Sequence, residues 1–225
     1  LTPRAWAGSV EKPGGSVRFT LDRDPPNVSF VSVPTHLGQE TIEVRARATD
    51  TLSGVAEVRL FAGANDLGAF VSLDNGEYTF DLSSSALPAG VVNLRVVARD
   101  RAGNEASASQ NLTVDRTPPT VVWKRPADGS RVSRTETLEV EASDNVGVAK
   151  VEFFAGSTKL GEATAAPYTF SWNTEAHPDG PVTLKARAVD GAGNASEATL
   201  TVTVANQDRT PPTVVWKRPA DGSRV

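Results

Sequence analysis

The sequence predicts an all-β fold, built from two-layer β-sandwiches in tandem and without significant helix. Three observations support this class. The eighteen residues Asp115–Val132 recur letter for letter at Asp208–Val225, 93 positions later, and a long fixed period indicates a chain of repeated units. Polar and apolar residues alternate with a period of two in many short segments, which is the pattern of half-buried strands. Gly, Pro, Asn and Asp separate those segments as turns.

The second repeat, residues 116–208, shows its elements most clearly. Tight-turn sequences such as Asp179–Gly180 and Gly191–Asn194 lie between apolar segments, and no segment has convincing helical periodicity. Alternation or a β-branched and aromatic run predicts strands at Thr120–Trp123, Thr137–Ala142, Val148–Phe154, Tyr168–Trp172, Thr183–Val189 and Thr199–Val204.

The first repeat, residues 23–115, follows the same plan with different letters. Its matching strands are Ile42–Ala48, Val55–Phe61, Tyr78–Phe80 and Leu94–Asp100. About seven short strands in roughly 90 residues, with frequent turn signals, is typical of an immunoglobulin-like sandwich.

The two ends of the chain correspond to parts of further units. Residues 1–22 match the last two strands of a preceding sandwich, and residues 209–225 match the first strand of a following one. Each fragment alone would expose apolar surface and unpaired strand edges. We therefore expect a window of a longer array, with its ends completed by residues or chains outside it. Strand exchange through Thr213–Trp216 is one way to complete them, and arbitrary segment limits are the simpler alternative.

Composition and charge exclude several classes of protein. The net charge is -4 with both signs interspersed, whereas a nucleic-acid-binding face is basic. The chain contains no Cys, so no disulfides join its strands, and no Met. These 225 residues include no signal-peptide pattern and no apolar run near the roughly 18 residues that cross a membrane, so we expect any export signal or anchor to lie outside them.

Six motifs follow one another in the second repeat: D-x-T-P-P-T-V, P-A-D-G-S-x-V, S-D-N-V-G-V-A-K-V-E-F-F, P-Y-T-F-S-W, D-G-P-V-T-L and A-R-A-V-D-G-A-G-N. In this order they resemble the bacterial Ig-like domain repeats of secreted and cell-surface proteins. The resemblance is strong over residues 116–207, good over 24–114 and looser over 1–22, where Ala7 replaces the aspartate. It implies a sandwich fold and an extracellular location. It implies no single function, because such modules occur in adhesin stalks, in filaments and as spacers in secreted hydrolases.

Aspartates lie at three places that a sandwich brings to one end: where the chain enters, after its second strand and after its sixth. In the second repeat these are Asp115, Asp144 and Asp190, with Asn145 and Asn194 beside them. Carboxylate and amide oxygens suit a hard cation that takes six to eight oxygen ligands. The sequence therefore predicts possible calcium sites at the domain junctions, with the first-repeat set being Asp22 or Asp24, Asp50 and Asp100.

A structural interpretation of the same aspartates stays open. Asp-Gly-Ala-Gly-Asn is a good tight-turn sequence, in which an aspartate caps the turn by accepting backbone N–H bonds. The chain also lacks the Asp-x-Asp-x-Asp loop of strong calcium sites. The sequence thus predicts either calcium or no cofactor at all.

Other residues indicate structure rather than chemistry. The pairs Pro25–Pro26, Pro118–Pro119 and Pro211–Pro212 predict short, stiff connections between units. Trp123 and Trp172 are expected in core or edge packing rather than against a sugar. One ring of Phe153–Phe154 is expected to face inward and the other outward, where it offers a lateral contact.

The sequence shows no set of catalytic residues. His36 and His177 fall at non-equivalent positions of the two repeats, and no nucleophile, zinc or phosphate motif is present. We predict a non-enzymatic structural module of an extracellular rod, stalk or filament, which associates with itself or with neighbouring repeats. The alternative is a spacer or carbohydrate-binding accessory module of a large secreted hydrolase, although we expect no carbohydrate ligand.

Overall fold

The computed structural model describes residues 20–207, and these form an all-β structure. The helices within this range are three 3-10 turns, η1 (Asp74–Gly76), η2 (Ser84–Ala86) and η3 (Thr174–Ala176). The all-β prediction is confirmed. The predicted end fragments, including the strand Thr213–Trp216, lie outside the described residues except for positions 20–22, and the predicted domain boundaries stay predictions.

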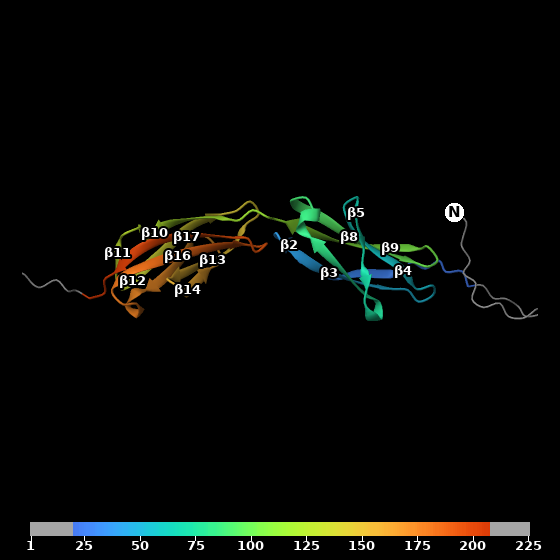
Figure 1. The fold of residues 1–225 in the computed structure, drawn as a ribbon, viewed down its shortest axis with the longest axis horizontal. Coiled ribbons are helices and arrows are strands. Elements are labelled where there is room, and N and C mark those ends of the chain that lie inside the picture. The colour runs from blue at the N-terminus through green and yellow to red at the C-terminus, as the bar shows by residue number, and fades with distance from the viewer. Residues whose placement is uncertain (1–19, 208–225) are drawn as a thin grey trace, which may run out of the picture. The chain divides into compact units, whose positions relative to one another are not determined.

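The first sandwich consists of a four-stranded sheet in the order β1-β3-β7-β6 and a five-stranded sheet in the order β2-β9-β8-β4-β5 (Figure 1). Neighbouring strands are antiparallel except for β2 and β9, where His36 pairs with Thr113 in a parallel register. The strands are β1 (Asn27–Ser32), β2 (His36–Leu37), β3 (Thr41–Thr49), β4 (Val55–Ala62), β5 (Asn65–Ala69), β6 (Val71–Ser72), β7 (Glu77–Ser83), β8 (Gly90–Asp100) and β9 (Glu105–Val114).

The second sandwich repeats this plan with a three-stranded sheet, β10-β12-β15, and a five-stranded sheet, β11-β17-β16-β13-β14. Its short strand β11 is parallel to β17, as β2 is to β9. The strands are β10 (Thr120–Arg125), β11 (Arg131–Val132), β12 (Thr135–Ser143), β13 (Val148–Ala155), β14 (Thr158–Ala163), β15 (Tyr168–Asn173), β16 (Gly180–Asp190) and β17 (Ala195–Val204).

Within the described residues each sandwich has seven strands of five or more residues, together with the two-residue strands β2, β6 and β11. These short strands, β5 and β14 were not predicted from the sequence, and no strand was named at the positions of β1 and β9 in the first repeat. The other strand predictions were too short at their ends: β16, for example, begins at Gly180 rather than at Thr183.

Alternation along the strands builds the core and also positions the acidic groups. In β16 the inward row is Leu184, Ala186, Ala188 and finally Asp190, all buried. Side chains of a strand point alternately to its two faces, so the same period that buries the aliphatic residues also buries this aspartate at the strand end. In β8, Asp100 ends the equivalent row and is 1% exposed.

The two cores differ in their largest side chains. Leu60, Leu82 and Leu94 fill the first, whereas Phe153 and Trp172 fill the second, and all five are at most 2% exposed. Burying a large apolar side chain contributes roughly 1.5–3 kcal/mol. Trp172 therefore belongs to the core, as predicted.

The other aromatic residues singled out in the sequence also have structural contacts. Trp123 donates its indole N–H to the Ala198 carbonyl at 3.1 Å. Phe154 is less buried than Phe153, and the Lys185 ammonium lies 4.7 Å from the centre of its ring. The alternation predicted for the two phenylalanines is thus present.

The chain divides into two compact units whose limits do not follow the sandwiches strictly. The first unit extends to Pro119 and also includes the turns Asp144–Val148 and Val189–Ala195. The second comprises Thr120–Ser143, Ala149–Ala188 and the residues from Ser196 onward. The linker after β9 and the turns after β12 and β16 therefore belong to one compact unit.

Candidate metal centre

The structure gathers the predicted aspartates into two clusters of three. One cluster is Asp22, Asp50 and Asp100, and the other is Asp115, Asp144 and Asp190. In each cluster every residue offers a carboxylate oxygen, and these oxygens all lie within 4.8 Å of one another. Asp24 lies outside the first cluster: its side chain is exposed, and its backbone N–H donates to Asp22 Oδ1 at 3.0 Å.

Each member of the second cluster lies at the end of a strand. Asp115 comes directly after β9 and donates its backbone N–H to the Leu37 carbonyl at 2.9 Å. Asp144 comes directly after β12, and Asp190 is the last residue of β16. The cluster lies within the first compact unit, so its geometry does not depend on how the two units are placed.

Asp190 has the turn-capping role that the sequence left open. Its Oδ1 accepts the backbone N–H groups of Ala192 at 2.8 Å and Asn194 at 2.9 Å. Its Oδ2 accepts the Asn194 side-chain amide at 2.8 Å, and the same amide nitrogen donates to the Asp115 carbonyl at 2.9 Å. Asn194 thereby ties the turn after β16 to the linker after β9.

Asp115 and Asp144 each use only one carboxylate oxygen for hydrogen bonds. Asp115 Oδ1 accepts the Thr117 N–H at 3.0 Å and the Asn145 side-chain amide at 3.2 Å. Asp144 Oδ2 accepts the Val146 and Gly147 N–H groups at 2.8 and 2.9 Å. The other oxygen of each, Asp115 Oδ2 and Asp144 Oδ1, is buried without a hydrogen-bond partner.

The first cluster is more completely hydrogen-bonded. The Ser53 N–H lies between two of its members, 3.0 Å from Asp22 Oδ2 and 2.8 Å from Asp50 Oδ1. Asp100 accepts two backbone N–H groups on Oδ1 and the Asn104 amide on Oδ2. Hydrogen bonding by the Ser53 side chain is the main cause that lowers the pKa of Asp22.

A different charged cluster, absent from the sequence predictions, lies on β13, β14 and β16. Glu152 is 7% exposed and pairs with Lys150 and Lys159, both at 2.8 Å, and with Arg187 at 3.1 Å. Hydrogen bonds from Lys150 and then Lys159 lower the pKa of Glu152 from 4.5 to about 2. The available signal in the sequence was Lys150 two positions before Glu152 on β13, which places both side chains on one face of the strand.

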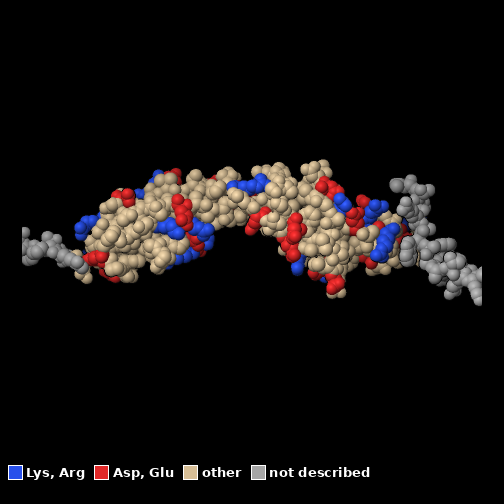
Figure 2. Space-filling model, viewed as in Figure 1, with Lys and Arg blue, Asp and Glu red and all other residues tan. Residues whose placement is uncertain are grey.

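The charged side chains of the visible surface are mixed in sign. Figure 2 shows Lys and Arg beside Asp and Glu on this face of both sandwiches. This distribution does not form the continuous basic stripe of a nucleic-acid-binding surface.

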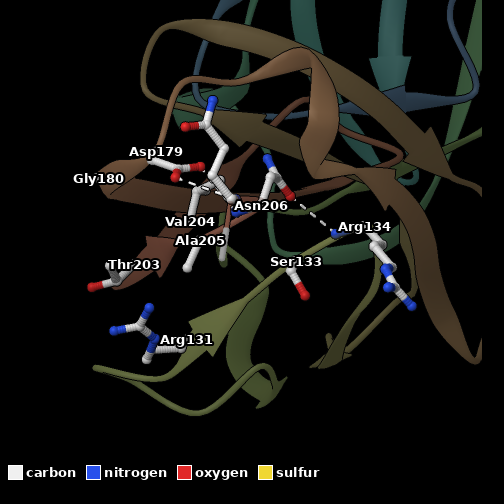
Figure 3. A pocket seen from close by; sticks show the side chains of 10 residues that line it. Arg131, Ser133, Arg134, Asp179, Gly180, Thr203, Val204, Ala205 and Asn206 are labelled. Atoms are coloured by element: carbon white, nitrogen blue, oxygen red, sulfur yellow. Dashed lines mark hydrogen bonds between the residues drawn. The ribbon is translucent and has the colours of Figure 1, made fainter. Parts of the chain in front are cut away.

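A hollow at one end of the second sandwich has Asn206 at its centre (Figure 3). The Asn206 N–H donates to Asp179 Oδ1 at 2.9 Å, and its side-chain oxygen accepts the Arg134 N–H at 3.1 Å. The lining residues include neither histidine nor cysteine, so this hollow offers no nucleophile–base pair of the usual kind. Its hydrogen bonds hold the end of β17.

The fold and the strand-end clusters define a tandem immunoglobulin-like β-sandwich module. A family model described as the bacterial Ig domain matches residues 26–96 and 119–186. These two matches cover more than half of the chain, so the chain belongs to the bacterial Ig domain family. The resemblance seen in the sequence motifs is thereby confirmed.

Two curated proteins show similarity over much of the chain. Exoglucanase B of Cellulomonas fimi is 29% identical over 223 residues, which cover 90% of this chain and 20% of that protein. Hyalin of Strongylocentrotus purpuratus is 32% identical over 164 residues, covering 64% of this chain and 12% of that protein. The chain thus spans a fifth or less of the length of these relatives.

One solved structure matches the fold over most of the chain. The fibronectin(III)-like modules of CbhA from Clostridium thermocellum align with a TM-score of 0.57 and 20% identity. The alignment covers 85% of this chain and 100% of the other. Among the described residues, no helix is long and apolar enough to cross a membrane.

Proposed function

We propose that this chain is a non-catalytic structural module of an extracellular protein, in which tandem sandwiches hold other parts at a distance, as in a rod or stalk. The observation that carries the proposal is the repetition of one complete sandwich plan in residues 27–114 and 120–204. Repeated units extend a chain without adding a new site to each copy. Membership of the bacterial Ig domain family supports the extracellular location.

The histidine and buried glutamate side chains, which are of the types that catalyse reactions in enzymes, have structural contacts in this chain. The His36 ring shares a hydrogen bond with the Thr35 hydroxyl at 3.0 Å. The His177 ring lies against Trp172, with 5.2 Å between their centres. Glu152 is held by three cationic side chains. These contacts favour a packing role for each group over a catalytic one.

A second candidate is a spacer module beside the catalytic domain of a secreted hydrolase. The match of 90% of this chain to one fifth of Exoglucanase B favours it specifically. A carbohydrate-binding version has less support, because Trp172 is 2% exposed and cannot stack on a sugar. Both candidates assign the sandwiches the same mechanical task and differ in what they connect.

Exchange of this segment in the native protein tests the proposal. We expect deletion of residues 23–207 to impair the protein's function, and an unrelated pair of rigid sandwich domains of similar length to restore it. A chain that must supply chemistry or a specific ligand contact would not be replaced in this way. Hydrolysis of a glycan by the purified chain would also contradict the proposal.

A further inference from the structure

Two buried carboxylate oxygens in the second cluster lack a partner. Asp115 is only 2% exposed, yet its Oδ2 accepts no hydrogen bond, and neither does the buried Asp144 Oδ1. An unsatisfied buried polar group costs roughly 1–3 kcal/mol, and more if it is charged. Two such atoms in one cluster of three carboxylates therefore indicate a missing positive partner.

Protein cations do not supply that partner. In the part of the chain that the structure describes, the ion pairs include none with Asp115, Asp144 or Asp190. The arginine next in sequence, Arg116, instead donates to the carbonyls of Ser84 and Leu87. A water molecule could donate hydrogen bonds to the free oxygens, but it would leave three neighbouring negative charges uncompensated.

In the first cluster, by contrast, no carboxylate oxygen of the three described aspartates is buried without a hydrogen-bond partner. Its loop after β3 is one residue longer, from Asp50 to Val55 against Asp144 to Val148, and the Ser53 N–H bridges two of the aspartates. The Arg101 guanidinium donates to the Ser53 carbonyl at 3.2 Å, which brings a positive charge to this loop. The residue that corresponds to Arg101 in the second sandwich is Gly191.

The chemistry of the second cluster selects the class of ligand. Its members offer only oxygen atoms, all within 4.8 Å of one another. Two oxygens at that separation can both lie about 2.4 Å from one cation, which is the distance typical of calcium. Softer metals prefer histidine or cysteine ligands, and the cluster contains neither.

We propose that Asp115, Asp144 and Asp190 bind one divalent cation of the calcium class, and that Asp22, Asp50 and Asp100 do not require one. The unpaired oxygens of Asp115 and Asp144 are the ligands that the cation gains. Asp190 adds its charge while it remains hydrogen-bonded to its turn. Because Asp115 belongs to the linker and the other two to turns, the cation holds the linker against the strand ends.

Isothermal titration calorimetry of the chelator-treated chain with CaCl₂ tests this assignment. We expect one equivalent of calcium to bind per chain. Asp144→Asn should weaken the affinity by at least about tenfold, as the loss of groups around a metal commonly does. Asp50→Asn, the matched change in the first cluster, should leave the affinity unchanged. Calcium should also raise the melting temperature of the unsubstituted chain in a concentration-dependent way.

Several results would overturn the assignment. One is that calcium gives neither a heat of binding nor a shift in melting temperature, and another is that two equivalents bind with equal affinity. The others are that Asp50→Asn weakens the affinity as much as Asp144→Asn, or that MgCl₂ shifts the melting temperature as much as CaCl₂. Circular dichroism establishes that each variant is folded, and Asp115→Asn replaces Asp144→Asn if the latter is not. A stoichiometry other than one calcium per unsubstituted chain would overturn the assignment without any variant.

Discussion

The two sandwiches carry ion-pair networks at the same positions with opposite signs. In the first, Arg59 lies between Glu57 and Asp66, at 2.6 and 2.7 Å. In the second, the corresponding positions are Glu152, Lys150 and Lys159. The backbone geometry of β4 and β13 thus fixes which side chains form ion pairs. The central side chain can carry either sign as long as its neighbours carry the opposite one, which indicates a stabilising role for the network.

The aspartate clusters show the opposite relation, because the charged residues are the same in both sandwiches and their hydrogen-bond partners differ. Their three acidic positions have the same letters in both sandwiches, but the surrounding donors do not. In the first cluster the Ser53 N–H donates to two aspartates, and Arg101 brings a positive charge to the Ser53 loop. The second sandwich has a shorter loop and Gly191 in place of the arginine, and one oxygen each of Asp115 and Asp144 is buried without a partner. Two clusters with the same three aspartates therefore need not both require a cation, because the hydrogen-bond donors around them determine that requirement.

The largest expected effect is the loss of stability when a core side chain of one sandwich is removed. Trp172→Ala should destabilise the second sandwich by about 3–5 kcal/mol, because it removes a large buried side chain and leaves a cavity. Leu82→Ala, at the corresponding position, should destabilise the first sandwich instead. Chemical denaturation followed by circular dichroism should show which transition moves. A shift of both transitions by either change would mean that the sandwiches do not unfold independently.

A smaller effect compares the two asparagines that follow the inward-facing aspartates. Asn194→Ala should cost about 1–3 kcal/mol, because Asp190 Oδ2 loses its donor in a buried site. Asn104→Ala should cost less: Asn104 contacts the Asp22 and Asp24 carbonyls only at 3.4 and 3.3 Å, against 2.9 Å from Asn194 to the Asp115 carbonyl. Thermal unfolding of both variants measures the difference. A larger loss for Asn104→Ala would contradict it.

The smallest effect concerns the sign-reversed networks. Glu152→Gln should destabilise the second sandwich by about 1–2 kcal/mol, since Lys150, Lys159 and Arg187 lose the buried charged acceptor to which they donate. Arg59→Gln should cost less, because the ion pairs of Arg59 are more exposed to solvent. Equal losses in urea denaturation at neutral pH would show that the burial of Glu152 has no energetic consequence.

The lowered pKa of Glu152 adds a pH dependence. Its folded value of about 2 lies below the ordinary 4.5, so the unfolded chain binds the proton more readily. The stabilisation is therefore complete above pH 4.5 and is lost as the pH falls toward 2. Melting temperatures over this range should converge for the unsubstituted chain and Glu152→Gln. A constant gap between them would refute this origin of the stability.

Much of the fold could be predicted because its long strands alternate. Leu184, Ala186 and Ala188 point inward with a period of two that is visible in the letters. Strand β14, Thr158–Ala163, was missed because its letters, TKLGEA, neither alternate nor contain β-branched runs. Two-residue strands such as β2 are too short for any period to show.

The candidate site could be predicted only in outline. Strand-end topology brings Asp144 and Asp190 together, and this was visible in the sequence. The choice between Asp22 and Asp24 was left open, although the 93-residue period aligns Asp22 with Asp115 and Asp24 with Thr117. The unpaired oxygens of Asp115 and Asp144 depend on where individual N–H groups point, and no spacing of letters encodes that.

A high-resolution crystal structure of the chain grown with CaCl₂ tests the central claim most directly. We predict one ion bound by Asp115 Oδ2 and Asp144 Oδ1, at the roughly 2.3–2.6 Å typical of calcium–oxygen bonds, and no ion at Asp22, Asp50 and Asp100. Density for water alone in the second cluster, or an ion in the first cluster only, would contradict the account.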